Sequence, residues 1–239
     1  MIIRARESGV TDILIPGFDL PSSIKAVEIA RKYGFFASCG LHPHDAKKFG
    51  SGTIREFESL AKKEKCVVAI GEIGLDFYKN YSPREVQVSV FHEFLQLACN
   101  LKKPVILHVR NAYAEVFRIL EDYNSDLPSV ILHCFSGGPE EVEQIRYKDN
   151  FFISFSGTIT YKNPGLIKAA KITPENKLLI ETDAPYLTPS QERGRNEPSF
   201  VKHVLNKMAL LRNKRPEEIS ELTFQNTHRA FKTKGNSPS

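Results

Sequence analysis

The 239-residue chain is 41% hydrophobic and carries 33 basic and 28 acidic residues, a net charge of +5 that permits a nucleic-acid substrate without requiring one. It can bury a core, and no linker-like stretch interrupts it, so we expect one domain over residues 1–231 and a disordered tail over 232–239. An apolar leader, a membrane-spanning run and closely spaced cysteines are all missing, which argues against secreted, membrane and disulfide-framework proteins and favours the cytoplasm.

Short runs rich in β-branched and other apolar residues predict seven strands. In chain order they cover residues 12–16, 35–40, 66–71, 104–108, 130–133, 151–155 and 178–183. Helix-like segments alternate with them, at 22–33, 53–63, 84–101, 112–122, 140–147, 165–170 and 198–212. Strands that alternate with helices predict an α/β fold with a parallel sheet.

Several strands are apolar without alternation, which is typical of strands covered on both faces in either a barrel or an open sheet. The chain length favours a TIM-type (β/α)8 barrel, which takes about 250 residues. On this interpretation the first strand is missing. Residues 1–8 predict a helix with no capping residue before it, so we expect either a functional protein that begins upstream of Met1 or a short frayed helix at the start.

Polar side chains that suit catalysis end or follow five of the predicted strands. They are His42, His44, Glu72, Asp76, His108, Arg110, His133, Glu181 and Asp183. The carboxyl ends of barrel strands meet on one face, where barrel enzymes place their chemistry. We expect these side chains to converge there. The remaining histidines, His92, His203 and His228, lie in predicted helices and are interpreted as structural.

Imidazole and carboxylate ligands without thiolates suit Zn²⁺, Mn²⁺ or Mg²⁺, and a shared carboxylate can bridge two ions. Such a site activates water, and its charge matches a phosphodiester, although an ester or amide substrate stays open. We interpret Gly71-Glu72-Ile73-Gly74 as a strand-to-helix turn rather than a phosphate-binding loop. Serine-nucleophile, P-loop and dinucleotide-binding motifs are missing from the sequence.

Five motifs in order resemble the TatD family of metal-dependent deoxyribonucleases. They are Gly40-Leu41-His42-Pro43-His44, Gly71-Glu72-Ile73-Gly74-Leu75-Asp76-Phe77-Tyr78, Leu107-His108-Val109-Arg110, His133-Cys134-Phe135-Ser136-Gly137 and Glu181-Thr182-Asp183-Ala184-Pro185-Tyr186-Leu187. The resemblance covers nearly the whole chain. It implies two divalent ions, with Glu72 as the bridging and catalytic carboxylate and with His108 and His133 on one ion. Asp183 then helps to hold the other ion and acts as the catalytic base.

The resemblance also implies that His42, His44 and Arg110 contact the substrate phosphate, and that Asp76 and Glu181 support the metal ligands from behind. An alternative role for His44 is to cap the helix that follows it. Members of the family open with a strand that ends in a His-x-His pair, which this sequence lacks before His42. We therefore expect one complete metal site and one that retains only Glu72 and Asp183.

Three functions follow from these patterns. The first is a deoxyribonuclease that uses a metal-activated water to cleave DNA, single-stranded or at a free end, with no membrane and no obligatory protein partner. The second is a metal-dependent esterase or deacylase acting on D-aminoacyl-tRNA. The third is a truncated product with impaired activity.

Overall fold

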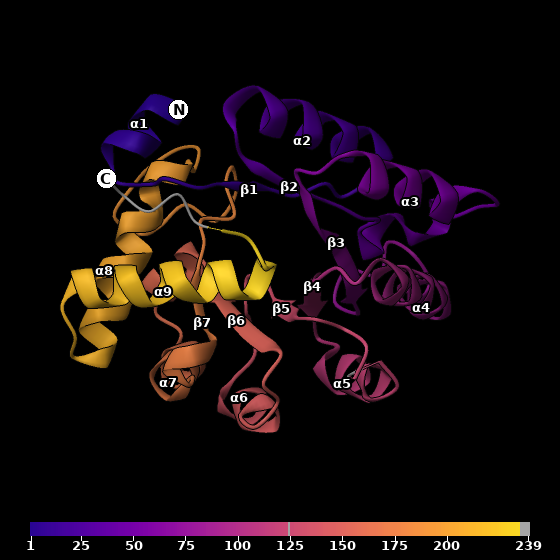
Figure 1. Cartoon of the computed structure of the whole chain (residues 1–239). Coiled ribbons are helices and arrows are strands. Elements are labelled where there is room, and N and C mark those ends of the chain that lie inside the picture. The colour runs from indigo at the N-terminus through magenta and orange to yellow at the C-terminus, as the bar shows by residue number, and fades with distance from the viewer. Residues whose placement is uncertain (124, 235–239) are drawn as a thin grey trace. The chain divides into compact units, whose positions relative to one another are not determined.

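The computed structural model describes residues 1–123 and 125–234, which fall into two compact units. The first comprises residues 13–132 and 231–233 and is called the five-strand unit here. The second comprises residues 1–12, 133–230 and 234 and is called the two-strand unit. Over these residues the chain has seven strands separated by helices (Figure 1), so the predicted α/β class and strand number are confirmed.

The five-strand unit contains a parallel sheet in which consecutive strands are neighbours. Its strands are β1 (Leu14–Ile15), β2 (Phe36–Cys39), β3 (Val67–Asp76), β4 (Val105–Arg110) and β5 (Val130–Leu132). Its helices are α2 (Leu20–Tyr33), α3 (Thr53–Lys63), α4 (Arg84–Leu101), α5 (Tyr113–Glu121) and the 3-10 helix η1 (Pro43–Lys48). The α-helices lie along the outer side of these strands (Figure 1), as a strand-helix alternation predicts.

Local sequence signals explain where α2 begins and ends. The side chain of Asp19 accepts a hydrogen bond from the Ser22 amide at 2.8 Å, and the Ser22 hydroxyl accepts one from the Asp19 amide at 2.9 Å. This reciprocal pair satisfies amides that the first helical turn would leave unpaired. At the other end Gly34 adopts a left-handed conformation (φ 72°) that stops the helix at little steric cost.

The prediction of a turn at residues 71–74 is wrong, because β3 continues through this segment to Asp76. Two glycines permit the continuation. A Cβ atom on Gly74 would lie 2.2 Å from the carbonyl oxygen of His108 on β4, and one on Gly71 would lie 2.6 Å from the Cβ atom of Ile106. Glycine therefore allows β3 to lie against β4, where any larger residue would push the strands apart.

The same segment contains a bulge. Ile70 is opposite Val105 and Ile73 is opposite Leu107, so three residue steps on β3 match two on β4. An extra residue in one strand bends it and redirects a side chain, and Glu72 lies within this irregular stretch. Glu72 and Asp76 therefore lie in the strand rather than after it, in contrast to the sequence-based placement.

The two-strand unit is mainly helical. Its strands are β6 (Phe151–Phe155) and β7 (Leu178–Ile180), which pair in parallel. Its helices are α1 (Ile2–Glu7), α6 (Pro139–Ile145), α7 (Pro164–Ile172), α8 (Val201–Arg212), α9 (Pro216–Phe231) and the 3-10 helices η2 (Gly157–Thr160), η3 (Glu175–Lys177) and η4 (Pro198–Phe200). The helix predicted at 198–212 is thus a 3-10 turn followed by α8.

All five residues of β6 are buried, and four of them are apolar, the exception being Ser154. Buried Asn226 of α9 donates hydrogen bonds to the carbonyl oxygens of Glu175 and Leu178, at 2.7 and 2.9 Å, and so joins α9 to the start of β7. Residues 235–239 of the predicted tail lie outside the described residues, and the single-domain interpretation stays a prediction. Among the described helices none has the length and apolar character to cross a membrane.

Candidate active site

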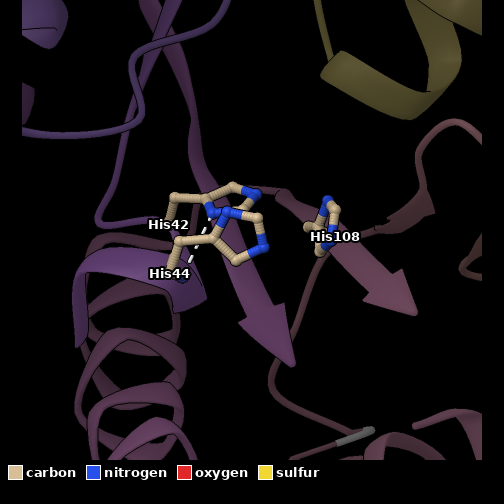
Figure 2. A group of neighbouring side chains, drawn as sticks. All are labelled: His42, His44 and His108. Atoms are coloured by element: carbon tan, nitrogen blue, oxygen red, sulfur yellow. Dashed lines mark hydrogen bonds between the residues drawn. The ribbon is translucent and has the colours of Figure 1, made fainter. Parts of the chain in front are cut away.

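Three histidines come together in the five-strand unit (Figure 2). His42 and His44 lie after β2 and His108 lies on β4. The His42 ring centroid is 4.3 Å from that of His44 and 4.4 Å from that of His108. Each ring offers a nitrogen within 4.8 Å of the others, a spacing that suits a shared metal ion. The sequence predicts that these residues converge, whereas the resemblance implies that His42 and His44 contact the substrate rather than a metal.

The helix cap next to this cluster is His42 and not His44, so the alternative role predicted for His44 is wrong. The His44 amide donates a hydrogen bond to Nδ1 of His42 at 3.2 Å, at the start of η1 (Figure 2). His42 can cap because the residue before a 3-10 helix places its side chain over the first amides. The hydrogen bond also fixes the orientation of the His42 ring.

Asp76 fixes the orientation of the other two histidines. Its carboxylate is fully buried, and its Oδ2 atom accepts hydrogen bonds from Nε2 of His44 at 2.7 Å and Nε2 of His108 at 3.1 Å. A charged carboxylate only accepts, so each Nε2 carries a proton, and in the neutral ring each Nδ1 carries the lone pair. Both rings therefore present Nδ1 as the atom for a metal ion or a proton, in the carboxylate–histidine arrangement common behind metal ligands.

The environment of Asp76 keeps it charged. Burial opposes the charged form, but hydrogen bonds from His108, the Lys79 amide and His44 outweigh burial and hold the pKa of Asp76 far below its usual range. Its second oxygen, Oδ1, accepts hydrogen bonds from the amides of Tyr78 at 3.0 Å and Lys79 at 2.8 Å. Asp76 is thus the anionic centre around which this part of the unit is arranged.

Glu72 enters the same neighbourhood from the β3 bulge. Its Oε2 atom lies 4.0 Å from Nε2 of His42, and both side chains are mostly buried. A carboxylate near imidazole nitrogens gives a mixed oxygen and nitrogen donor set without thiolates, which fits Mg²⁺, Mn²⁺ or Zn²⁺. The bulge accounts for this position, because it interrupts the regular in-and-out alternation of the strand.

Arg110, at the end of β4, is exposed and lies over an aromatic ring. Its guanidinium carbon is 4.1 Å from the ring centroid of Tyr78. The predicted contact between Arg110 and a substrate phosphate stays a prediction. The aromatic partner is a residue that the sequence-based site omits, since an exposed tyrosine cannot be distinguished from a core tyrosine by pattern alone.

A second group lies in the two-strand unit and contains His133, Glu181 and Asp183, whose ligand atoms lie within 4.8 Å of one another. Nδ1 of His133 is 2.8 Å from Oε1 of Glu181, and the Cys134 amide donates to the same oxygen at 3.0 Å. The resemblance implies Glu181 as a support for the ligands, and this role stays a prediction. Its position places its carboxylate beside His133 and Asp183.

Burial on its own raises the pKa of Glu181, but the charge of His133 and hydrogen bonds from His133, Ser154 and the Cys134 amide outweigh it. The pKa of Glu181 is therefore below its usual value. When the His133 ring is neutral, a charged Glu181 holds its single proton on Nδ1 and leaves the lone pair on Nε2. The same arrangement therefore occurs once in each unit: a carboxylate determines which nitrogen of a histidine can bind a ligand.

The four predicted metal ligands fall in both units, with Glu72 and His108 in the five-strand unit and His133 and Asp183 in the two-strand unit. Their joint role stays a prediction. The three other histidines, His92, His203 and His228, lie in helices as predicted, where His92 contacts the Tyr123 hydroxyl at 2.9 Å and His203 contacts Glu192 at 2.7 Å.

Comparisons with known proteins agree on one family. A family model described as "TatD related DNase" matches residues 1–232. A Bacillus subtilis protein named "Uncharacterized metal-dependent hydrolase YabD" is 40% identical over 97% of this chain and 91% of its own length. A Cronobacter sakazakii protein named "3'-5' ssDNA/RNA exonuclease TatD" is 37% identical over 97% of this chain and 90% of its own length.

Solved structures give the same result. The crystal structure of YjjV, a TatD homologue from Escherichia coli, has a TM-score of 0.90 at 28% identity and covers 97% of this chain and 90% of its own. A TatD-family hydrolase from Entamoeba histolytica has a TM-score of 0.87 at 26% identity, over 95% of this chain and 87% of its own. The predicted α/β fold class is therefore confirmed over nearly the whole chain.

Proposed function

Because the chain belongs to the TatD-related DNase family of metal-dependent hydrolases, we propose that it cleaves phosphodiester bonds in single-stranded nucleic acid, starting from the 3' end. The observation that carries the proposal is the cluster of His42, His44 and His108 around buried Asp76. Fixed imidazoles beside a carboxylate suit a site for divalent ions and phosphate. The names of several relatives support the polarity and the single-stranded substrate.

We assign the metal ligands from the family motifs as Glu72, His108, His133 and Asp183. A divalent ion held by such ligands would acidify a water molecule and stabilise negative charge on phosphate oxygens. Asp183 accepts the proton of the attacking water, and Glu72 anchors the site from the β3 bulge. The carboxylate of Asp76 holds the proton of His108 on Nε2, which leaves Nδ1 of this ring as the atom that would contact an ion.

The substrate phosphate is assigned to His42, His44 and Arg110. A guanidinium can donate two parallel hydrogen bonds to phosphate oxygens, which gives Arg110 both affinity and orientation. His44 can donate from Nδ1 when its ring carries two protons, because its Nε2 proton is held by Asp76. These donors orient the phosphate for attack by the water molecule.

The proposal is tested with the full chain and single-stranded DNA labelled at its 5' end, with Mg²⁺, Mn²⁺ or Zn²⁺ and with a chelator. We expect a ladder of products shortened from the 3' end, lost with the chelator and weak on a blunt duplex. Cleavage confined to a D-aminoacyl-tRNA ester, or no DNA cleavage with any of the three ions, would contradict the assignment to nucleic acid.

A further inference from the structure

The loop between β3 and α4 exposes two tyrosines beside positive charges. Tyr78 and Tyr81 are each 56% exposed, a large fraction for aromatic side chains. The Nζ atom of Lys79 lies 5.7 Å from the ring centroid of Tyr78 and 5.9 Å from that of Tyr81. The guanidinium of Arg110 covers Tyr78 at 4.1 Å. Aromatic faces and cations are thus interleaved on one exposed surface, called the tyrosine loop here (residues 77–83).

The tyrosine loop is held in place at both of its ends. At its start, Oδ1 of Asp76 accepts hydrogen bonds from the amides of Tyr78 and Lys79. At its end, Nε2 of buried Gln87 donates to the carbonyl oxygen of Ser82 at 2.8 Å, and the same side chain bonds both backbone groups of Asp76. A surface that is already ordered loses little conformational entropy when a ligand binds.

The tyrosine loop also adjoins the histidine cluster. The ring centroids of Tyr81 and His44 are 4.8 Å apart, and the interplanar angle is 76°. Ser82 strengthens the junction, because its hydroxyl donates to the carbonyl oxygen of His44 at 2.8 Å and accepts from the Lys47 amide at 3.0 Å. Through Asp76, one buried carboxylate contacts the histidines with Oδ2 and the loop with Oδ1. A ligand on the loop would lie beside the proposed phosphate site.

We propose that the tyrosine loop is a base-stacking subsite for single-stranded nucleic acid. This rests on the proposed function for its substrate class. Every base has a π-face that can stack on a tyrosine whatever the sequence, and cations beside the rings attract the phosphates. In a duplex the base faces are covered by neighbouring bases, so the loop selects unpaired ends. Tyr81 carries the main stacking surface, because Arg110 already covers Tyr78.

The test compares two oligonucleotides of equal length and charge, one with bases and one built from abasic sugars. Both carry phosphorothioate linkages that resist cleavage, and binding to the metal-loaded full chain is read by fluorescence anisotropy. We expect the parent to prefer the oligonucleotide with bases. Tyr81→Ala should weaken binding of the oligonucleotide with bases by about 5- to 100-fold and leave the affinity for the abasic oligonucleotide unchanged, since stacking involves bases only.

Three variants sharpen this result. Tyr81→Phe keeps the aromatic face and should restore parent affinity. Tyr147→Ala removes a tyrosine that is 90% exposed outside the loop, and it should leave both affinities unchanged. Lys79→Gln should weaken binding of both oligonucleotides equally and reduce the slope of log affinity against log salt by about 0.7, as expected for one lost phosphate contact on a single strand.

Cleavage of a normal single-stranded oligonucleotide is measured in parallel. If the parent prefers the oligonucleotide with bases and Tyr81→Ala abolishes this preference, the subsite is supported. If the parent then cleaves nothing, only the proposed function fails. Equal affinity of the parent for both oligonucleotides would overturn the subsite, whatever the cleavage result. Loss of both affinities in Tyr81→Ala would also overturn it, because that marks a general structural role.

Discussion

Asp76 contacts four groups at once, two histidine rings and two loop amides, and it is fully buried. Its value to the site comes from having two accepting oxygens, because Oδ2 accepts from both histidine rings while Oδ1 accepts from both loop amides. The resemblance implies Asp76 as a support for the ligands, and this role stays a prediction, to which the structure adds the contact with His108. The contact with His44 is a tertiary feature, since it depends on how the segment after β2 returns toward β3.

The first prediction follows from this geometry. In Asp76→Asn an NH2 donor replaces one of the two accepting oxygens. It would face either the two Nε2 protons, which disturbs the tautomers of His44 and His108, or the two loop amides, which displaces the loop. We expect affinity for Mn²⁺ and turnover of single-stranded DNA each to fall by about 10- to 100-fold, as for the loss of other carboxylates behind metal ligands. Metal binding is measured by calorimetry and folding by circular dichroism.

A matched control is Asp45→Asn, which removes a more exposed carboxylate of η1 that pairs with Lys48 at 2.9 Å. This variant should keep parent affinity and turnover. If Asp76→Asn also binds Mn²⁺ and turns over DNA as the parent does, then Asp76 has no part in orienting the histidines.

At the scale of elements, the bounds of helices and strands are predicted best where local sequence signals alone determine them. The run 151–155 forms β6 at its predicted bounds because all five residues are buried, and α3 and α4 also match their predicted bounds. Prediction fails at β3, where Gly71 and Gly74 indicate a turn by local propensity. There the close approach of β4 requires glycine, and such a contact between distant segments has no local signal.

The junction of α1 and η4 is held by an ion pair that the sequence did not predict. The Glu197 carboxylate accepts hydrogen bonds from Nε of Arg4 at 2.9 Å and from Nη2 at 2.5 Å. The hydrogen bond from Arg4, followed by that from Ser199, lowers the pKa of Glu197 from its ordinary 4.5 to about 2. The pair joins residues 193 positions apart, so it restrains the beginning of the chain.

The second prediction concerns pH and stability. Because the pKa of Glu197 is lowered in the folded protein, the stabilisation by the pair is present above pH 4.5 and is lost as the pH falls toward 2. Glu197→Gln should therefore lower the melting temperature at pH 6–7. The difference in melting temperature between variant and parent should become smaller as the pH falls toward 3. Scanning calorimetry across this pH range measures it.

Arg4 is 60% exposed, so solvent screening keeps the effect small. The contrasting variant is Glu143→Gln, which removes an exposed pair with Arg146 within three residues along the chain. Its effect on the melting temperature should be smaller, since that pair holds no distant segments together. A parent and a Glu197→Gln variant with the same melting temperature at every pH would show that the α1–η4 pair contributes nothing.

At the scale of the whole molecule, the order of motifs along the chain predicts the family, and the alternation of strands and helices predicts the fold class. The family and the fold class are both confirmed. Each can be recognised from the sequence, because motif residues and the alternation of apolar runs are visible along the chain. The finer organisation of the site cannot. Two of its features depend on contacts between segments that are distant in sequence. These are the spacing of His42 and His44 from His108, and the exposure of Tyr78 and Tyr81.

The central claim is that hydrolysis depends on a divalent ion held with the help of Glu72. The most direct measurement is Mn²⁺ titration of chelator-treated parent and Glu72→Gln proteins, followed by the rate of single-stranded DNA cleavage. The parent should be inactive without metal and recover as Mn²⁺ is added, whereas Glu72→Gln should stay at least about 100-fold slower at saturating Mn²⁺, because the amide cannot replace the charge of the carboxylate. Cleavage by Glu72→Gln at the parent rate, or metal-independent cleavage by the parent, would contradict the account.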